Sequence, residues 1–574
     1  MRWAGGLRRR IVLFVFLFPA LLRLPAPAQT SAATSQSNAT PQTGIAVSKT
    51  GASIPQSSNS VPGNEACSSC HAEIYKSYSK TIMAQASGPA AEGLITGEFE
   101  DDISGVQYRI YEKDGRVWMS YKRERELSGQ RELRYFIGSG KKGRTYLFPD
   151  DGYLFEAPIN WYTREKRWNM TPAYMDAQEI PMNLPAFESC LNCHTSGMQT
   201  PMPGTANKFA GKPFLHNGIT CERCHGAGDG HIAGKGTIVN PAKLPPERRD
   251  SICMECHFEG ATAVEQPGKR VYEFQPGDRL SDYIHYFVLR QNEPDKPEAL
   301  SQFQALSMSA CKKKSGDRMW CGSCHDSHEE PAEAEKAAYY RRKCLNCHRQ
   351  AFAASHHPEK PDCISCHMPS LPSADVAHTE GTDHRIRRYP QMPELITRVP
   401  GPTLESFPQD NAAEVTNRDL ALGWYSLAQR GMQGAEGETE KYLGKAIKDR
   451  PDDPDVLEAW AFVEQKHGHR KDAELLYAKV LKGNPLSNTA DTNLGILEAR
   501  GGNIRDAVKL WQAAFSRVPY RSEIGVDLAI VFCADGQKDI ARKYLDRVME
   551  FNPDYGKAKG LMEHMKGDSG ECKP

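Results

Sequence analysis

The stretch Gly218-Ile-Thr-Cys-Glu-Arg-Cys-His-Gly226 contains the pattern that decides how this chain is organised. Two cysteines are separated by two residues, and a histidine follows the second cysteine directly. This five-residue motif occurs seven times and uses 14 of the 17 cysteines. The seven copies are Cys67-Ser-Ser-Cys70-His71, Cys190-Leu-Asn-Cys193-His194, Cys221-Glu-Arg-Cys224-His225, Cys253-Met-Glu-Cys256-His257, Cys321-Gly-Ser-Cys324-His325, Cys344-Leu-Asn-Cys347-His348 and Cys363-Ile-Ser-Cys366-His367.

The spacing indicates covalent attachment of haem c. Two thiols one helical turn apart can form thioethers with the two vinyl groups of one haem, and the adjacent histidine can then ligate the iron. The motifs therefore predict seven haems in one chain. The predicted proximal iron ligands are His71, His194, His225, His257, His325, His348 and His367.

Three other interpretations of the cysteines explain the pattern less well. Zinc sites combine cysteine pairs two at a time, and seven pairs is an odd number. A thioredoxin-type redox motif normally occurs once and sits on a βαβ unit. Structural disulfides suit an exported protein, but they give no reason for a histidine at a fixed offset.

Each iron has a second axial position, for which the same region offers candidates. The histidines outside the motifs number eight in this region, and His356 and His357 are expected to provide one ligand between them. His285 is predicted to lie in a helix. Met83, twelve residues after His71, is a further candidate, with a buried core methionine as the alternative. The candidate distal ligands are Met83, His231, His285, His328, His357, His378 and His384, with His216 also available.

The N-terminus has the features of a secretory signal peptide over residues 1–28. Arg8-Arg9-Arg10 precede an apolar run of about 12 residues, which is shorter than the roughly 20 needed to span a bilayer. Ala26-Pro27-Ala28 provides a cleavage signal. We therefore expect export to the periplasm or cell surface, with no transmembrane span in the mature chain.

Composition and periodicity divide the rest of the chain, after the signal peptide, into segments. Residues 29–62 are expected to form a disordered linker, 63–390 a heptahaem domain, 391–412 a second linker and 567–574 a tail. Within the haem domain, residues 95–180 lack cysteine and are expected to form an inserted β-rich subdomain with hairpins at Asp114-Gly115 and Asp151-Gly152.

Residues 413–566 repeat with a period of 34. Proline recurs at this spacing, and an alanine stands twelve residues before each of the last three prolines, where paired helices need a small residue for close packing. The four prolines are Pro451, Pro485, Pro519 and Pro553. The pattern resembles tetratricopeptide repeats, which commonly present a partner-binding surface. The first repeat fits less well, which suggests an insertion around residues 431–437.

The expected fold class is therefore mainly α: a loop-rich multihaem domain with a small inserted β subdomain, followed by a tetratricopeptide-repeat α-solenoid. The 72 basic and 72 acidic residues balance, which argues against nucleic acid as a partner. Cys311 is expected to be buried or reactive, Cys533 to lie in a helix core and Cys572 in the tail.

The chain resembles bacterial multihaem cytochromes c whose haem domain is related to the nitrifier tetrahaem cytochrome and is fused to tetratricopeptide repeats. Besides the motifs, the resemblance rests on Tyr135-Phe-Ile-Gly-Ser-Gly140, Gly143-Arg-Thr-Tyr-Leu147, the stretch 218–226 with His231, Cys321 to His328, and His378 to Ile386. It implies haem c, export and electron transfer. Related domains often have histidine where this chain has Met83.

Electron transfer between redox partner proteins is thus the leading expectation, with the repeats as a docking site. One alternative is an enzyme acting on a small nitrogen or sulfur compound at a haem with an open site. Another is a redox sensor in which the repeats carry the main function.

Overall fold

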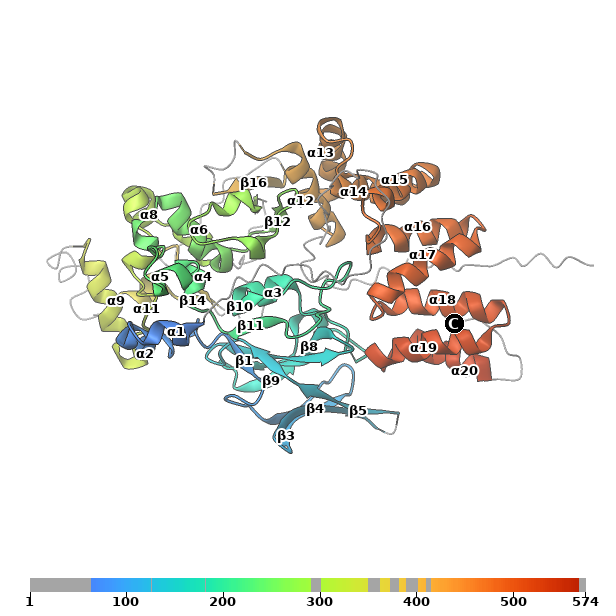
Figure 1. Cartoon of the computed structure of the whole chain (residues 1–574), viewed down its shortest axis with the longest axis horizontal. Helices are drawn as coiled ribbons and strands as arrows, with labels where there is room; N and C mark the ends of the chain where they lie inside the picture. The colour runs from blue at the N-terminus through green and yellow to red at the C-terminus, as the bar shows by residue number, and fades with distance from the viewer. Residues whose placement is uncertain are drawn as a thin grey trace, which may run out of the picture.

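The computed structural model describes residues 63–124, 126–180, 182–290, 301–348, 362–371, 381–388, 401–408 and 414–566. Figure 1 shows short helices at one end of the molecule, β-sheets in the middle and a curved row of helices along the other side. The predicted signal peptide, the linker 29–62 and the tail with Cys572 lie outside the described residues.

Two antiparallel sheets dominate the first third of the described chain. One has the order β1-β6-β7-β8-β9 and the other the order β2-β3-β4-β5. Their strands are β1 Ser87–Pro89, β2 Gly97–Glu100, β3 Gln107–Lys113, β4 Arg116–Arg123, β5 Leu127–Leu133, β6 Tyr135–Ile137, β7 Gly143–Asp150, β8 Tyr153–Tyr162 and β9 Arg167–Met170.

Both predicted hairpins are confirmed. Strands β3 and β4 pair from Lys113 opposite Arg116, and β7 and β8 pair from Asp150 opposite Tyr153. The two central residues of each turn have positive φ, 53° and 70° at Asp114 and Gly115. Asp-Gly pairs tolerate this conformation, which matches the twist of the flanking strands.

Further strands lie among the cysteine motifs. A three-stranded sheet has the order β12-β13-β16, and two short pairs are formed by β10 with β11 and by β14 with β15. Their bounds are β10 Thr195–Met198, β11 Phe214–Asn217, β12 Thr262–Glu265, β13 Ile284–Arg290, β14 Ser370–Leu371, β15 Gly381–Thr382 and β16 Thr403–Phe407.

Two expectations are corrected by the three-stranded sheet. His285 lies in β13 and not in a helix, because its neighbours in Ile-His-Tyr-Phe-Val are β-branched or aromatic and favour a strand. β16 lies within residues 391–412, which composition predicted to be a linker, and pairs with β13.

Most motif segments lie in short helices joined by loops. The α-helices of this region are α1 Asn64–Ser68, α2 Ala72–Tyr78, α3 Glu188–His194, α4 Glu222–His225, α5 Asp229–Ile232, α6 Pro246–His257, α7 Gln302–Met308, α8 Ala310–Ser315, α9 Lys336–Leu345 and α11 Ile364–His367. Its 3-10 helices are η1 Pro172–Tyr174, η2 Pro241–Lys243, η3 Val271–Glu273, η4 Leu280–Asp282, η5 Gly316–Arg318, η6 Cys321–Ser323 and η7 Glu333–Glu335.

The C-terminal helices form antiparallel pairs with the predicted period. A spacing of 34 residues separates the starts of successive helices α14, α16, α18 and α20, at Pro454, Asn488, Ser522 and Gly556. The full set is α12 Asn417–Gln429, α13 Ala435–Asp449, α14 Pro454–Lys466, α15 Arg470–Gly483, α16 Asn488–Arg500, α17 Ile504–Arg517, α18 Ser522–Ala534, α19 Lys538–Phe551 and α20 Gly556–Lys566. These are tetratricopeptide repeats.

The last repeats share a hydrophobic core with the β-sheets. Tyr153 and Phe155 of β8 contact Tyr520 and Phe551, with ring centroids 5.4–5.8 Å apart. At the same contact Asp554, which is 2% exposed, pairs with Arg123 at 2.6 Å. In Figure 1, α18 to α20 lie beside the end of β8. The solenoid is therefore packed against its own chain.

The first repeat is also packed against the cytochrome part. Val264 and Phe287 of the three-stranded sheet share a buried cluster with Ala421, Leu422 and Tyr425 of α12. The many helices agree with the expected fold class, but the sheets make up more of the molecule than the expectation of a mainly α protein allows. Within the described residues, every helix is too short or too polar to cross a membrane.

Candidate functional site

The motif backbone brings each pair of cysteines onto one helical turn. In the third motif, the N–H of His225 donates to the carbonyl of Cys221 at 2.9 Å, and the same bond occurs from His71 to Cys67 and from His325 to Cys321. A turn of this kind places residues i and i+3 on one face. Both thiols can therefore reach one haem, with the histidine beside them.

Cysteines of different motifs lie in contact. The side chain of Cys67 in the first motif contacts that of Cys221 in the third. The other contacting pairs are Cys193 with Cys256, Cys253 with Cys321 and Cys344 with Cys363. Groups attached to these sulfurs would lie against one another.

Three motif histidines face a second histidine with nearly parallel rings. The ring centroids of His71 and His231 are 6.4 Å apart, those of His225 and His328 are 6.0 Å apart, and those of His325 and His384 are 6.2 Å apart. An iron bound between two imidazoles, with each bond about 2 Å and each nitrogen about 1 Å from its centroid, would separate the centroids by about 6 Å. These three pairs therefore fit haem iron.

Hydrogen bonds fix the rings of several of these histidines. The Nδ1 atom of His225 lies 2.8 Å from the carbonyl of Val239, and that of His384 lies 2.7 Å from the carbonyl of Thr382. In the last motif, His367 Nδ1 lies 2.7 Å from a backbone carbonyl. A carbonyl requires a proton on Nδ1, which leaves Nε2 with the lone pair that a metal needs.

Met83 is a candidate distal ligand for the first haem, and the structure places a different residue opposite His71. His231, not Met83, lies against His71. The backbone carbonyl of Met83 instead accepts from the N–H of Ile219, just before the third motif. Met83 therefore helps to hold the chain beside that motif.

His285 has a partner on the repeats. It is 4% exposed, and its Nδ1 lies 3.3 Å from the carboxylate of Asp419 in α12. His216 lies in β11 beside Gly63. The candidates His356, His357 and His378 lie outside the described residues.

A buried polar cluster joins three motifs and was not predicted from the sequence. Each member occupies the third position of its motif. Arg223 pairs with Glu255 at 2.8 Å, and Asn192 donates to the same carboxylate oxygen at 3.1 Å. Arg223 also donates to the backbone carbonyl of Asn192 at 3.0 Å. The second, third and fourth motifs are thereby held in one arrangement.

Two carboxyl groups beside the second motif have unusually high pKa values. Burial raises the pKa of Glu156, whose carboxylate accepts from the Cys190 thiol at 3.4 Å, to about 7. Burial also raises the pKa of Glu188, at the start of α3, to about 7 against the lowering effect of Arg270. Both groups can therefore exchange protons at neutral pH.

The remaining cysteines are also placed. Cys311 lies close to Cys347 and Cys324, between the fifth and sixth motifs. Cys533 is 2% exposed in α18 and is disulfide-bonded. Its predicted core position is confirmed.

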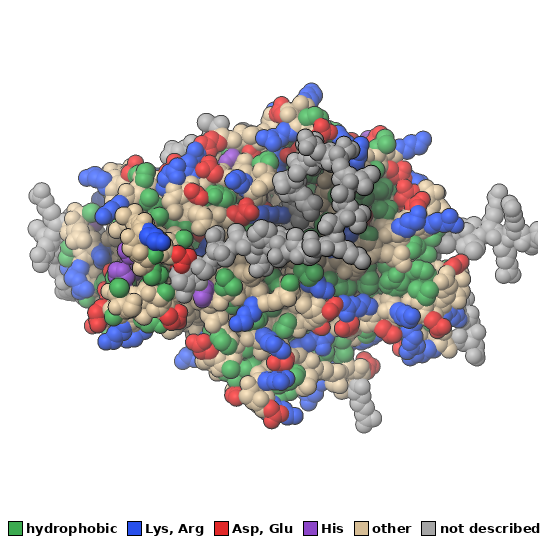
Figure 2. All heavy atoms as spheres, in the orientation of Figure 1, with side chains coloured by type: hydrophobic (Ala, Val, Ile, Leu, Met, Phe, Trp, Pro, Cys, Tyr) green, Lys and Arg blue, Asp and Glu red, His purple; other side chains and the backbone are tan. Residues whose placement is uncertain are grey.

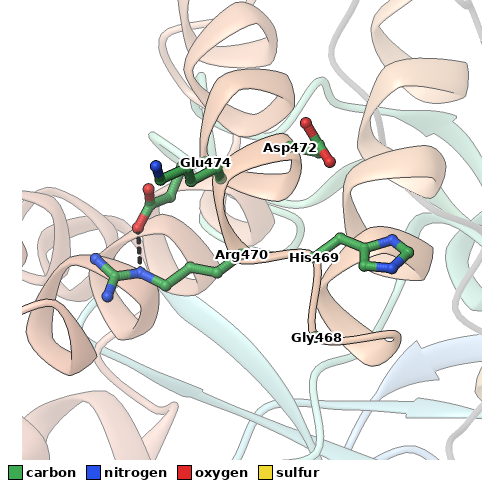
Figure 3. Close-up of a pocket in the computed structure, with 6 residues that line it drawn as sticks. Gly468, His469, Arg470, Asp472 and Glu474 are labelled. Carbon is green, nitrogen blue, oxygen red and sulfur yellow. Dashed lines mark hydrogen bonds and ion pairs between the residues drawn. The ribbon is translucent and has the colours of Figure 1, made fainter.

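A surface pocket at the turn between α14 and α15 is separate from the motifs (Figure 3). It has a volume of about 490 Å³ and is lined by residues 468–472 and Glu474. His469 pairs with Glu464 at 2.6 Å, and Asp472 lies close to both. These are exposed groups with local partners, and we assign them no role.

Comparison with known proteins agrees with the motif chemistry. Residues 160–226, which contain the second and third motifs, match the family described as cytochrome c554 and c-prime. The chain is also 24% identical over 199 residues to the dissimilatory sulfite reductase MccA of Wolinella succinogenes. That match covers 29% of this chain and 24% of the relative's length.

The chain is a multihaem cytochrome with tetratricopeptide repeats. Such cytochromes bind haem c covalently through their paired cysteines. Among solved structures, a tetratricopeptide repeat protein from Parabacteroides merdae aligns with 25% of this chain and 56% of its own, at 17% identity and a TM-score of 0.22. YrrB, a TPR protein with an unusual peptide-binding site, aligns with 27% of this cytochrome and 79% of its own chain, at 17% identity and a TM-score of 0.23.

Proposed function

We propose that this cytochrome is an exported electron carrier that holds seven haem c groups, one at each motif. The motif cysteines would form the thioethers, and the motif histidines would be the proximal iron ligands. His231, His328 and His384 would complete the coordination at the first, third and fifth motifs. Bound haem supplies the one-electron chemistry.

The observation that carries this proposal is the continuity of contacts between motifs. Sulfur contacts link the first motif to the third, the second to the fourth, the fourth to the fifth and the sixth to the seventh. Cys224 lies close enough to Cys256 to interact electrostatically, which links the third and fourth motifs. Cys344 and Cys324 link the sixth to the fifth in the same way.

These links join all seven motifs into one branched path. Through their cysteines, the fourth motif is linked to three others, whereas the first, second and seventh are each linked to one. Electrons entering at the first or seventh position would reach every haem through adjacent neighbours. The second position would be a side branch at the junction.

The repeats would dock a redox partner protein. Solenoids of this type present extended surfaces to partners. Both ends of this solenoid pack on its own chain, so a bound partner would be held at a fixed position relative to the haems. Figure 2 shows basic and acidic side chains interspersed over the visible face. A partner would therefore meet mixed charge here rather than a single-sign surface.

Export is supported by the signal-like N-terminus and by the disulfide at Cys533, since structural disulfides persist in oxidising compartments. We place the mature protein in the periplasm or at the cell surface.

Reductive titration with electron paramagnetic resonance tests the electron-carrier proposal. We expect the purified holoprotein to take up seven electrons per chain and to show only low-spin ferric haem. A high-spin signal that changes on adding sulfite, nitrite or hydroxylamine would contradict it.

That contrary result would favour a second function, a multihaem oxidoreductase acting on a small nitrogen or sulfur compound at one haem with an open site. Two observations favour this candidate. One is the similarity to a sulfite reductase. The other is the pair of carboxyl groups with pKa values near 7 beside the second motif. Reduction of an oxyanion consumes protons, which such groups can deliver.

A further inference from the structure

Strand β8 separates two different environments. Side chains alternate along a strand, so neighbouring residues point to opposite faces. Tyr153 and Phe155 belong to the core shared with the repeats. Leu154 belongs to the cluster that contains Leu191 and contacts Cys190 of the second motif. Glu156 points to the same face as Leu154.

Among the described residues, few titratable groups interact with the carboxyl of Glu156 on that face. Cys190 is its hydrogen-bond donor, at 3.4 Å. Tyr174 of η1 also interacts with it and stays protonated at neutral pH, because burial raises the pKa of Tyr174 well above its usual value. Among the described residues, no lysine or arginine contributes to the pKa of Glu156. A desolvated carboxyl without a cation is costly when ionised.

Attachment of haem would change this contact. Once Cys190 Sγ is a thioether, it carries no proton to donate. The hydrogen bond from Cys190 lowers the pKa of Glu156, so its loss would raise that pKa further. The carboxyl would then lie within contact distance of the sulfur that joins the second haem to the chain.

We propose that Glu156 is the proton acceptor coupled to reduction of the haem held by Cys190 and Cys193. This inference rests on the proposed function, because it requires a haem at that motif. Glu156 gains one proton from solvent for each electron that a neighbouring haem delivers to this site. The ionised carboxylate becomes a neutral carboxylic acid, and the added negative charge is compensated. Oxidation returns the electron to a neighbouring haem and the proton to solvent.

Protonation of Glu156 accompanies reduction of this haem for an electrostatic reason. An electron placed close to an ionised carboxylate in a desolvated site meets a like charge, and protonation removes that repulsion. The second motif lies at the end of a branch in the proposed path, where a proton-coupled step would leave the direct route between the first and seventh motifs unaffected.

Spectroelectrochemistry of the holoprotein between pH 6 and 8 tests this proposal. We expect one haem potential to fall as pH rises in the wild type, by up to about 59 mV per tenfold change in proton activity. Glu156→Gln should abolish that slope. Glu98→Gln is the control, because the Glu98 side chain is 74% exposed and pairs with Arg109 in the other sheet, and it should leave the slope unchanged.

Redox difference infrared spectroscopy provides a second measurement that does not depend on the variant's stability. Reduction of the wild type at neutral pH should produce the carbonyl band of a protonated carboxyl. Absence of that band, or a slope that survives Glu156→Gln, would overturn the proposal. A purified chain without haem at Cys190 and Cys193 would instead overturn the proposed function itself.

Discussion

Replacing Arg223 with methionine should destabilise the centre of the cytochrome. Arg223 is 16% exposed and Glu255 is 2% exposed in their ion pair. Removing one partner of a buried pair leaves an uncompensated charge and costs about 3–5 kcal/mol. We expect Arg223→Met to lower the free energy of unfolding by an amount in this range, measured by guanidinium denaturation of the holoprotein.

Two comparisons make the prediction specific. Arg223→Met/Glu255→Met removes both charges and should recover most of the lost stability, because apolar replacement of a whole buried pair is often neutral. Arg109→Met removes an exposed pair with Glu98 and should cost less than about 1 kcal/mol. A cost below about 1 kcal/mol for Arg223→Met, or a double variant no more stable than the single one, would refute this account of the cluster.

Three further predictions concern the ligands, the repeats and pH. In electron paramagnetic resonance, His231→Ala should convert one low-spin haem to high spin, and added imidazole should restore the low-spin signal. Met83→Leu should leave the spectrum unchanged. The reverse pattern would identify Met83 as the ligand. Asp554→Ala should lower the free energy of unfolding by about 1–3 kcal/mol and speed proteolysis of the repeats, because Asp554 accepts from Arg123 and from the N–H of Ile180. The control is Asp506→Ala, which removes an exposed pair with Lys509. Equal effects of the two substitutions would count against a shared core. Burial raises the pKa of Asp527 to about 6, so its ionisation opposes folding and the stability of the protein falls as pH rises from about 4 to 6. In thermal unfolding, Asp527→Asn should therefore stabilise the protein by about 1–2 kcal/mol at pH 7.5 but not at pH 4. An equal effect of the substitution at both pH values would contradict the assignment.

Local patterns allowed the sequence to predict several elements. An Asp-Gly pair between alternating strands specifies a hairpin within a few residues, as at Asp114-Gly115. The 34-residue period specifies a helix pair, because each repeat needs the same small residue where its helices cross, as at Ala507 and Ala541. Such signals do not depend on distant parts of the chain.

Features that depend on distant contacts could not be predicted. His71 and His231 are 160 positions apart, and nothing local assigns one to the other. The ion pair of Arg223 with Glu255 joins two motifs whose middle positions look unremarkable in sequence. Glu156 gave no signal at all, because its high pKa arises from burial beside Cys190 on another element.

The packing of the repeats against the rest of the chain also depends on tertiary contacts. The sequence predicts only repeats that follow a linker and dock a partner. Aromatic residues of β8 and of the repeats instead form one core, so removal of residues 413–574 would expose Tyr153 and Phe155.

The number of covalently bound haems tests the central claim most directly. Intact-mass spectrometry of the purified holoprotein, produced with a haem-attachment system, should give the mass of the chain plus seven haems. Cys221→Ser/Cys224→Ser should give six. A wild-type mass with fewer than seven haems, or one unchanged by this double substitution, would contradict the account.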